Sequence, residues 1–412
     1  MIRCIARQPI LDRLERVYGF ELQPRRGEEE TWRSPDVAGT EEGAPAAAPP
    51  FDWISEFTEG TRAFIKCTPQ AMASGQVALL PRDQVVLETP VPATPDEGFV
   101  KTCRTLKAAG YAIALENYQS TWEVPLTDIA DMVKVDVTAF PDRIQWLLIR
   151  KYRPNGIVFI ADKVDKRSQF QAAGQQGFSY FQGQFYSRAE PFSTSELTPT
   201  KLVYLLVLRA VTRPEINMQE VADTIKHDLA LSYRLLRFLN SARFAFHSKI
   251  KSVRHALLLL GQNEIRKWIG LVSLAALGEG GPPLPVNMAL IRAAFCEALA
   301  PLVGATKRES DYFFLGLLSS IDVLMRRPMR VILAELPMAS DVSDALMGEQ
   351  NSLRDVLQAV TSYEQGKWEE CFQLGEKLGL KEENFPGLFL RALRWSRELT
   401  QIKQAEPADV RC

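Results

Sequence analysis

The chain has 412 residues, of which 46% are hydrophobic and 24% charged, and its formal net charge is -1. This length exceeds what one hydrophobic core usually serves, so two domains are expected. The near-zero charge argues against a protein that holds nucleic acid by bulk electrostatics. The six cysteines form no CxxC pair, which argues against a disulfide framework or a zinc site and favours a reducing compartment.

The beginning of the sequence and its apolar runs bear on location. The first residues, MIRCIARQPILDR, reach charged side chains at once, so no signal peptide is expected. No run of about 18 apolar residues occurs, so we expect neither a transmembrane helix nor a membrane partner. The sequence therefore predicts a cytoplasmic protein.

Up to about residue 190, short β-rich runs alternate with segments of helical periodicity. The predicted strands are 4–9, 17–22, 62–67, 85–87, 112–115, 132–135, 156–160 and 180–182. Helical segments between them include 98–109, 144–151 and 166–173. Strands that alternate with helices predict a largely parallel sheet, and eight such units predict an α/β domain closed as a (β/α)8-type barrel.

Two segments interrupt this pattern. Residues 26–50 contain RGEEE and an Ala/Pro run with almost no large apolar side chains, which predicts a disordered insertion in a barrel spanning 1–192. Residues 193–199 are rich in Ser, Thr and Pro, which predicts a linker, with the next helix capped near Thr198 or Thr200.

From residue 200 to about 404 the β pattern is absent, and the sequence predicts an all-helical domain. Segments with helical spacing are 202–211, 218–225, 229–239, 253–260, 264–277, 289–303, 312–325, 352–364 and 368–378. No repeat period indicates a solenoid.

Polar residues stand at the ends of seven of the predicted strands. These residues are Glu21, Lys66, Glu88, Glu116 with Asn117, Lys134 with Asp136, Asp162 and Gln182. In a barrel of parallel strands these ends meet at one rim, where active sites lie. One charged residue after a strand is more often a solvated loop residue, but seven together favour a functional site. No histidine precedes His227, so a metal ion here would have oxygen ligands, which suit Mg²⁺, Mn²⁺ or Ca²⁺.

A series of motifs along the first half carries a family resemblance. YGFELQPR, VVLETP, YAIALENY, MVKVD, ADKVD and FSYFQGQFYSRAEP resemble, in order, the motifs of EAL domains, the cyclic di-GMP phosphodiesterase barrels. The opening ARQPILDR resembles the first strand of that family. The resemblance implies metal-assisted hydrolysis of one phosphodiester bond, with two divalent ions that activate water and neutralise phosphate charge.

The resemblance also implies roles for single residues. Glu21 matches the Glu of the motif that names the family, and Glu88 matches a second metal-ligand Glu. Arg25 matches the Arg that contacts phosphate. Lys134 matches the catalytic-site Lys, and Gln182 matches the late Gln in the last strand.

Five positions depart from the family pattern. Lys66 stands where the family has a metal-ligand Asn, and an ammonium group has no lone pair with which to coordinate a metal. Glu116 and Asn117 replace two adjacent Asp residues, and Asn117 lacks the charge needed to bridge two cations. Asp162 and Asp165 replace a Glu-x-x-Glu pair, each one methylene shorter. The two-metal centre is therefore not expected to assemble, and Mg²⁺ or Mn²⁺ would serve only an active barrel.

Three interpretations of this rim remain open. The retained residues could form a hydrogen-bonded network without turnover, in which Lys66 pairs with Glu21 or Glu88. The barrel could bind cyclic di-GMP without hydrolysing it. It could also be a weak cyclic di-GMP phosphodiesterase that uses Glu21, Glu88 and Lys134.

The second half carries another resemblance. The stretch from MQEVADTIK to RKWIGL, together with FFLGLLSSIDVLM, is similar to HDOD domains, helical modules related to the HD phosphohydrolases. That resemblance places Ser319 and Ser320 where HD enzymes have a metal-binding His-Asp pair, and hydroxyl groups cannot replace those ligands. The HD dipeptide at His227 and Asp228 falls at a predicted helix start, so Asp228 is interpreted as a helix cap.

The two resemblances together predict a bacterial signal-transduction regulator with a degenerate EAL barrel and an HDOD domain that contacts partner signalling proteins. Nucleic-acid binding by the helical domain is a third possibility. Its support is a basic stretch in which His247 and His255 flank Lys249, Lys251 and Arg254, although a solvated surface explains that stretch equally well.

Overall fold

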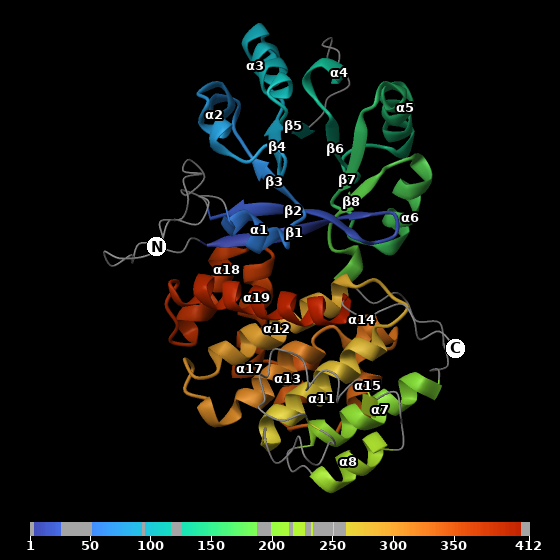
Figure 1. The fold of residues 1–412 in the computed structure, drawn as a ribbon, viewed down its shortest axis with the longest axis vertical. Helices are drawn as coiled ribbons and strands as arrows, with labels where there is room; N and C mark the ends of the chain where they lie inside the picture. Colours follow the sequence, from blue (N-terminus) through green and yellow to red (C-terminus); the bar gives the residue numbers. More distant parts are fainter. Residues whose placement is uncertain are drawn as a thin grey trace. The chain divides into compact units, whose positions relative to one another are not determined.

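The computed structural model describes residues 4–25, 52–92, 95–116, 126–187, 199–213, 217–226, 232–233, 250 and 261–404 (Figure 1). The chain divides into two compact units, Met1–Arg188 with Tyr363–Trp368, and Ala189–Ser362 with Glu369–Cys412. Several features named above lie outside the described residues: the 26–50 insertion, Asn117, the 193–198 part of the linker, the His227–Asp228 dipeptide, His247, His255, the predicted helix 253–260 and most of 229–239. No helix of the described residues is long and apolar enough to cross a membrane.

The first unit is a closed barrel of eight strands, which confirms the predicted fold class. The strands are β1 (Ile5–Asp12), β2 (Val17–Pro24), β3 (Arg62–Lys66), β4 (Val85–Pro90), β5 (Ala112–Glu116), β6 (Met132–Asp136), β7 (Val158–Asp162) and β8 (Tyr180–Gln182). From β2 to β8 neighbouring strands run parallel. Helices lie around the outside of the strands (Figure 1).

The first strand departs from the predicted parallel pattern. β1 runs antiparallel to both β2 and β8. A tight turn after Asp12 causes this, because the Asp12 N–H donates to Arg16 O at 2.9 Å and the Asp12 carboxylate accepts from Leu14 N at 2.8 Å. Two strands joined by so short a turn must be antiparallel, since a parallel pair needs a long crossover.

The described part of residues 4–187 forms six α-helices. They are α1 (Asp52–Thr58), α2 (Pro69–Ala73), α3 (Glu97–Ala108), α4 (Leu126–Ile129), α5 (Asp142–Tyr152) and α6 (Arg167–Gln176). The three helical segments named from the sequence correspond to α3, α5 and α6. Asp96 caps α3, because its carboxylate accepts from Phe99 N at 2.7 Å.

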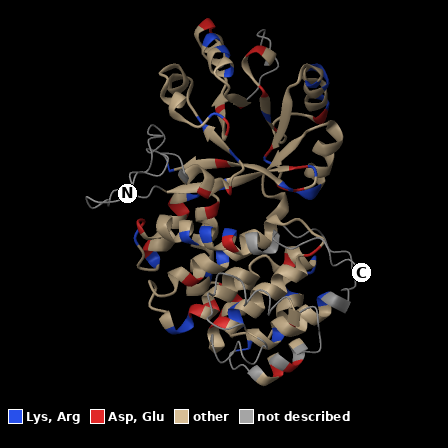
Figure 2. Ribbon diagram, in the orientation of Figure 1, with Lys and Arg blue, Asp and Glu red and all other residues tan. Residues whose placement is uncertain are grey.

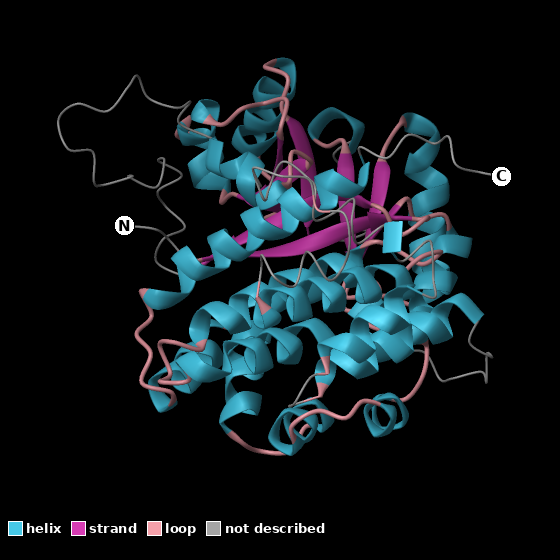
Figure 3. Ribbon diagram, turned by 60° about the horizontal axis from the view of Figure 1, so that its bottom comes forward, coloured by secondary structure: helices cyan, strands magenta, loops and turns pink. Residues whose placement is uncertain are grey.

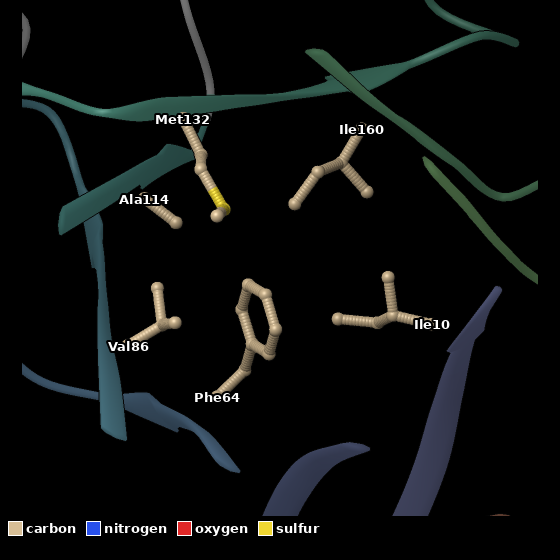
Figure 4. Packing of buried hydrophobic residues seen from close by; sticks show 6 residues of the cluster. All are labelled: Ile10, Phe64, Val86, Ala114, Met132 and Ile160. Carbon is tan, nitrogen blue, oxygen red and sulfur yellow. The ribbon is translucent and has the colours of Figure 1, made fainter. Parts of the chain in front are cut away.

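An apolar layer fills the barrel interior (Figure 4). It consists of Ile10, Phe64, Val86, Ala114, Met132 and Ile160. Gly19 in β2 makes room for this layer, because a Cβ there would lie 2.6 Å from Arg62 O and 3.1 Å from the Phe64 ring. These side chains set the interior face of each strand, and that face continues toward the rim.

In the second unit the described residues form helices and no strand, in agreement with the prediction (Figure 3). The helices are α7 (Pro199–Thr212), α8 (Met218–Lys226), α11 (Gln262–Leu277), α12 (Leu284–Leu299), α13 (Glu309–Leu318), α14 (Ile321–Met325), α15 (Met329–Glu335), α16 (Ser340–Met347), α17 (Ser352–Glu364), α18 (Trp368–Lys377) and α19 (Asn384–Gln404). Helices α15, α16 and α19 were not predicted from the sequence. The single helix predicted over 312–325 was wrong, since the chain breaks between α13 and α14 at Ser319 and Ser320.

Arg266 closes the end of α7. Its side chain is 8% exposed, and it donates from Nε to Val211 O at 2.6 Å and from Nη2 to Thr212 O at 3.3 Å. These carbonyl groups at a helix C-terminus have no partner within the helix. Arg266→Met is expected to lower the free energy of unfolding of the helical unit by about 2–3 kcal/mol, because two buried acceptors lose their donor.

Hydrogen exchange at α7 peptides of the full chain checks this prediction, with Arg330→Met as the control. Arg330 is exposed on α15, so its replacement should change stability by no more than about 0.5 kcal/mol. Equal exchange rates in the two variants would contradict the proposed cap.

Candidate functional site

The strand alternation builds a polar layer next to the apolar one. Successive side chains on a strand point to opposite faces, so residues two positions apart share a face. Two positions beyond the apolar residues of β3 to β7 stand Lys66, Glu88, Glu116, Lys134 and Asp162. On five consecutive strands, the side chains that face the interior thus change from apolar to charged over two residues, at the carboxyl end of the barrel.

Lys134 lies at the centre of this layer. Its ammonium group is 2.5 Å from Glu21 Oε2, 2.5 Å from Glu88 Oε1 and 3.4 Å from Glu116 Oε1. The Lys134 side chain is 4% exposed, and those of Glu21 and Glu88 are 1% and 0% exposed. One buried cation therefore joins carboxylates from three strands that are far apart in the sequence.

Lys66 supplies a second cation. Its ammonium group lies 3.0 Å from Glu116 Oε1 and 3.3 Å from Glu21 Oε1, and its side chain is 49% exposed. The sequence predicted a partner in Glu21 or Glu88. The structure places Lys66 on Glu21 and, in addition, on Glu116, a pairing that the sequence analysis did not foresee.

Three amide side chains complete the network. Gln182 donates from Nε2 to Glu21 Oε2 at 2.6 Å and to Gln8 Oε1 at 2.8 Å. Gln23 donates to Glu21 Oε1 at 2.8 Å. The sequence analysis singled out Gln182 but missed Gln8 and Gln23. The register of the β1–β2 hairpin, in which Gln8 faces Glu21, would have indicated them.

At the centre of the rim, Glu21 and Lys134 each stabilise the charged form of the other. Burial alone would raise the pKa of Glu21, but the ammonium groups of Lys134 and Lys66 hold that pKa well below its ordinary value. Burial alone would lower the pKa of Lys134, but Glu88 and Glu21 raise it well above the usual lysine value. The pKa of Lys66 is likewise raised, because its carboxylate neighbours outweigh burial. Both lysines are therefore charged at neutral pH.

Glu88 behaves in the opposite way. Burial, together with the neighbouring carboxylates of Glu21 and Glu116, holds the pKa of Glu88 well above its ordinary value, although Lys134 opposes this. For Glu116, burial raises the pKa, but its hydrogen bond with Glu88 and the two ammonium groups lower it overall. Protonation of Glu88 would leave two carboxylates, Glu21 and Glu116, beside the two ammonium groups of Lys66 and Lys134.

The remaining predicted residues divide between the rim and the surface. Asp162 lies within the field of Lys134, and burial raises its pKa. Asp165 is not brought into the network, since its carboxylate accepts from Gln184 N at 3.0 Å. Asp136 pairs with the exposed Lys163 at 2.6 Å. Arg25 follows β2, half-buried, and its backbone N–H donates to Cys4 O at 3.1 Å.

A divalent cation does not fit the described rim residues. The oxygen atoms of Glu21 and Glu116 that face the interior already contact ammonium groups, and a cation placed among them would be repelled by Lys66 and Lys134. Within the described ranges, no group of three His, Cys, Asp or Glu side chains has the geometry to hold a metal ion. The contacts that these rim side chains make in the structure are charge pairs and hydrogen bonds.

In the helical unit, the guanidinium group of Arg292 lies beside Ser319 and Ser320, the two serines that the resemblance to HD enzymes places at the His-Asp positions. Arg292, 7% exposed on α12, donates from Nη1 to Ser320 Oγ at 3.0 Å and to Ser319 Oγ at 3.3 Å. The backbones of α12 and α13 touch here, because a Cβ on Gly316 would lie 2.3 Å from Arg292 O. The two serines named from the sequence therefore link α12 to the junction of α13 and α14.

The chain thus combines a closed barrel that carries a polar rim with a helical unit, the architecture that the resemblance to EAL and HDOD domains implies. The HDOD family model matches residues 197–360. The uncharacterized protein YuxH of Bacillus subtilis is 32% identical over 412 residues, which cover 97% of this chain and 99% of that protein. The chain belongs to the family of YuxH.

Two further proteins are similar to this chain. A protein of Vibrio cholerae named cyclic di-GMP phosphodiesterase CdgJ is 27% identical over 411 residues, 97% of this chain and 93% of that protein. The solved structure of the EAL enzyme Bd1971 is 15% identical, with a TM-score of 0.33. The match covers 45% of this chain and 61% of the Bd1971 chain, which is less than two thirds of that chain. The HDOD match and the homology to CdgJ confirm the predicted combination of domains.

Proposed function

We propose that this chain is a regulator in cyclic di-GMP signalling whose barrel does not hydrolyse the nucleotide. The homology to CdgJ supports the signalling pathway. One observation carries the second half of the proposal: the ammonium groups of Lys66 and Lys134 contact the rim carboxylates at 2.5–3.4 Å. Metal-assisted hydrolysis needs those oxygen atoms as ligands.

The regulator acts through binding. A balanced, hydrogen-bonded rim is a preorganised surface, and half-exposed Lys66 offers a cation to a phosphodiester at its mouth. The HDOD domain is proposed to contact partner signalling proteins in the cytoplasm, and its Arg292–Ser320 link supports a role without metal.

Incubation of the full chain with cyclic di-GMP and Mg²⁺ or Mn²⁺, followed by chromatography, tests the absence of hydrolysis. We expect no linear dinucleotide above the protein-free control. Hydrolysis that Glu21→Gln abolishes, while the exposed Glu97→Gln on α3 retains it, would overturn the proposal.

Calorimetry with cyclic di-GMP separates the modes of action. Binding that needs no divalent cation indicates a nucleotide sensor. Binding only in the presence of the cation favours the second candidate, a weak phosphodiesterase that uses Glu21, Glu88 and Lys134, which the homology to CdgJ supports. No binding under either condition indicates a scaffold that acts through the HDOD domain alone.

A further inference from the structure

The turn between α14 and α15 carries an arginine in a backbone conformation that favours glycine. Arg326 ends α14 with φ 51° and ψ 42°, in the left-handed region. A Cβ atom is disfavoured there, so glycine is the usual residue where a helix ends in this conformation. An arginine at this position therefore costs stability that a glycine would not, and strained residues of this kind cluster at functional sites.

The lack of an ion pair distinguishes Arg326 from the other residues in this conformation. Three further non-glycine residues of the described chain have positive φ, and an ion pair holds the side chain of each. The pairs are Glu15 with Arg167, Glu59 with Arg7 and Lys163 with Asp136, at 2.5–2.7 Å. The side chain of Arg326 is exposed and makes no ion pair or hydrogen bond with any described residue. Its guanidinium group is therefore available to an anion from outside the chain.

Positive charge is concentrated around this position. Residues 323–334 contain three arginines and no acidic residue, whereas positive and negative residues are interspersed over most of the second unit (Figure 2). Arg327 is engaged, since its Nη2 contacts Glu335 Oε1 at 2.7 Å. Arg330 on α15 is exposed and, like Arg326, has no ion-pair partner in the described part of the chain. Four residues of chain span at most about 14 Å, so these two long side chains can meet at one ligand.

We propose that Arg326 and Arg330 bind cyclic di-GMP on the helical unit. A planar guanidinium group binds a phosphate through two parallel hydrogen bonds, and it binds the O6 and N7 edge of guanine in the same way. Cyclic di-GMP presents both groups twice within one small molecule, so each arginine can find a bidentate partner. Such a site presupposes the proposed role in cyclic di-GMP signalling, and it would let the helical unit respond to the nucleotide without the barrel.

Two other kinds of anion fit these arginines less well. Nucleic acid is held through many cations, whereas the chain has a net charge of -1 and offers two unengaged arginines in this described turn. An acidic segment of a protein could pair its carboxylates with the guanidinium groups, but exposed ion pairs of that kind contribute little affinity. A guanine nucleotide adds the base edge to the phosphate, so each contact is stronger and more specific.

Calorimetry of the full chain with cyclic di-GMP in EDTA tests the site, because no divalent cation can then assist binding in the barrel. Arg326→Gln with Arg330→Gln should weaken binding about tenfold or more, since two bidentate contacts are lost. Cyclic di-AMP should bind the wild type at least about fivefold more weakly, because adenine presents an N6 donor where guanine presents an acceptor. Loss of binding in Lys66→Gln but not in the double arginine variant would place the nucleotide in the barrel and overturn the site.

Arg326→Gly separates loss of the ligand contact from loss of the fold. Glycine suits the left-handed backbone, so hydrogen exchange at α14 and α15 peptides should stay equal or slow by up to about fivefold, while affinity for the nucleotide falls about fivefold or more. Unchanged affinity in this variant would contradict a role for the Arg326 side chain.

The matched control is Lys307→Gln with Arg391→Gln. It removes the same charge from exposed positions of the same unit and should change affinity by less than about threefold, because exposed charges away from a ligand are screened by salt. The site is overturned by no binding of cyclic di-GMP to the wild type, by equal affinity for cyclic di-AMP, or by equal losses in the control and arginine variants. The absence of hydrolysis by the barrel would stand in each case, since it is measured separately.

Discussion

Replacement of Lys134 by Met is expected to lower the stability of the barrel by about 3–5 kcal/mol at pH 7.5, because removing one partner leaves a buried charge uncompensated. The Lys134 ammonium group contacts both Glu21 and Glu88 at 2.5 Å, and both side chains are almost fully buried, with Glu21 carrying the charge that Lys134 compensates. Hydrogen exchange at peptides from β2, β4 and β6 measures this loss in the barrel separately from the helical unit. Exchange rates there should rise by at least two orders of magnitude.

The loss should depend on pH, and its sign follows from Glu21. In the wild type the pKa of Glu21 is lowered, so its carboxylate stabilises the fold above its unfolded pKa near 4.3 and loses that effect as pH falls. Without Lys134, burial dominates and raises the pKa of Glu21. The carboxyl then takes up a proton on mild acidification, so the deficit should shrink between pH 7.5 and pH 5.

Glu88→Gln is the matched control. Because burial and the neighbouring carboxylates raise the pKa of Glu88 and so favour its uncharged form, an amide of the same shape should change stability by less than about 1 kcal/mol. The exposed Lys163→Met should also have a small effect, since surface ion pairs contribute at most about 1 kcal/mol. A Glu88→Gln loss as large as that of Lys134→Met would show that Glu88 is ionised.

The strand pattern made much of this site predictable. Residues at the ends of parallel strands converge whatever their chemistry, so Glu21, Glu88, Lys134 and Gln182 could be placed on one rim from sequence spacing alone. The departure at Lys66 could also be recognised, because the resemblance to EAL domains implies a metal-ligand Asn at this position and an ammonium group cannot take that role. Local pattern and barrel closure agree here, since both require the same side of each strand to face inward.

Which side chains of the rim contact each other could not be predicted from the sequence. Which carboxylates Lys66 reaches depends on side-chain paths across neighbouring strands, and Glu116 entered the pairing only in the folded chain. Gln8 was missed because the sequence predicted only a largely parallel sheet, and it is the antiparallel register of β1 that sets Gln8 opposite Glu21. The break between α13 and α14 was missed as well, since the bond from Ser319 Oγ to Gly316 O, 2.7 Å long, competes with the helix locally.

Lys66→Asn is expected to increase the affinity of the barrel rim for Mn²⁺ at least 100-fold over the wild type. The substitution removes an ammonium group 3.0 Å from Glu116 and 3.3 Å from Glu21 and supplies an amide oxygen instead. Two unit charges 4 Å apart near a protein surface repel by about 4 kcal/mol, and a divalent ion doubles this. Loss of that repulsion, together with one uncompensated carboxylate, accounts for the expected gain.

Electron paramagnetic resonance of free Mn²⁺ measures binding without relying on turnover. Lys66→Met isolates the charge from the ligand, because it removes the ammonium group but offers no oxygen, so its affinity should fall between wild type and Lys66→Asn. Lys163→Asn removes an exposed lysine near the rim and should leave Mn²⁺ binding unchanged. Equal Mn²⁺ affinity in wild type and Lys66→Asn would mean that Lys66 leaves the carboxylates when metal arrives. In that case a metal ion would displace the Lys66 ammonium group from the rim carboxylates. A weak cyclic di-GMP phosphodiesterase would then be the better explanation of what the barrel does.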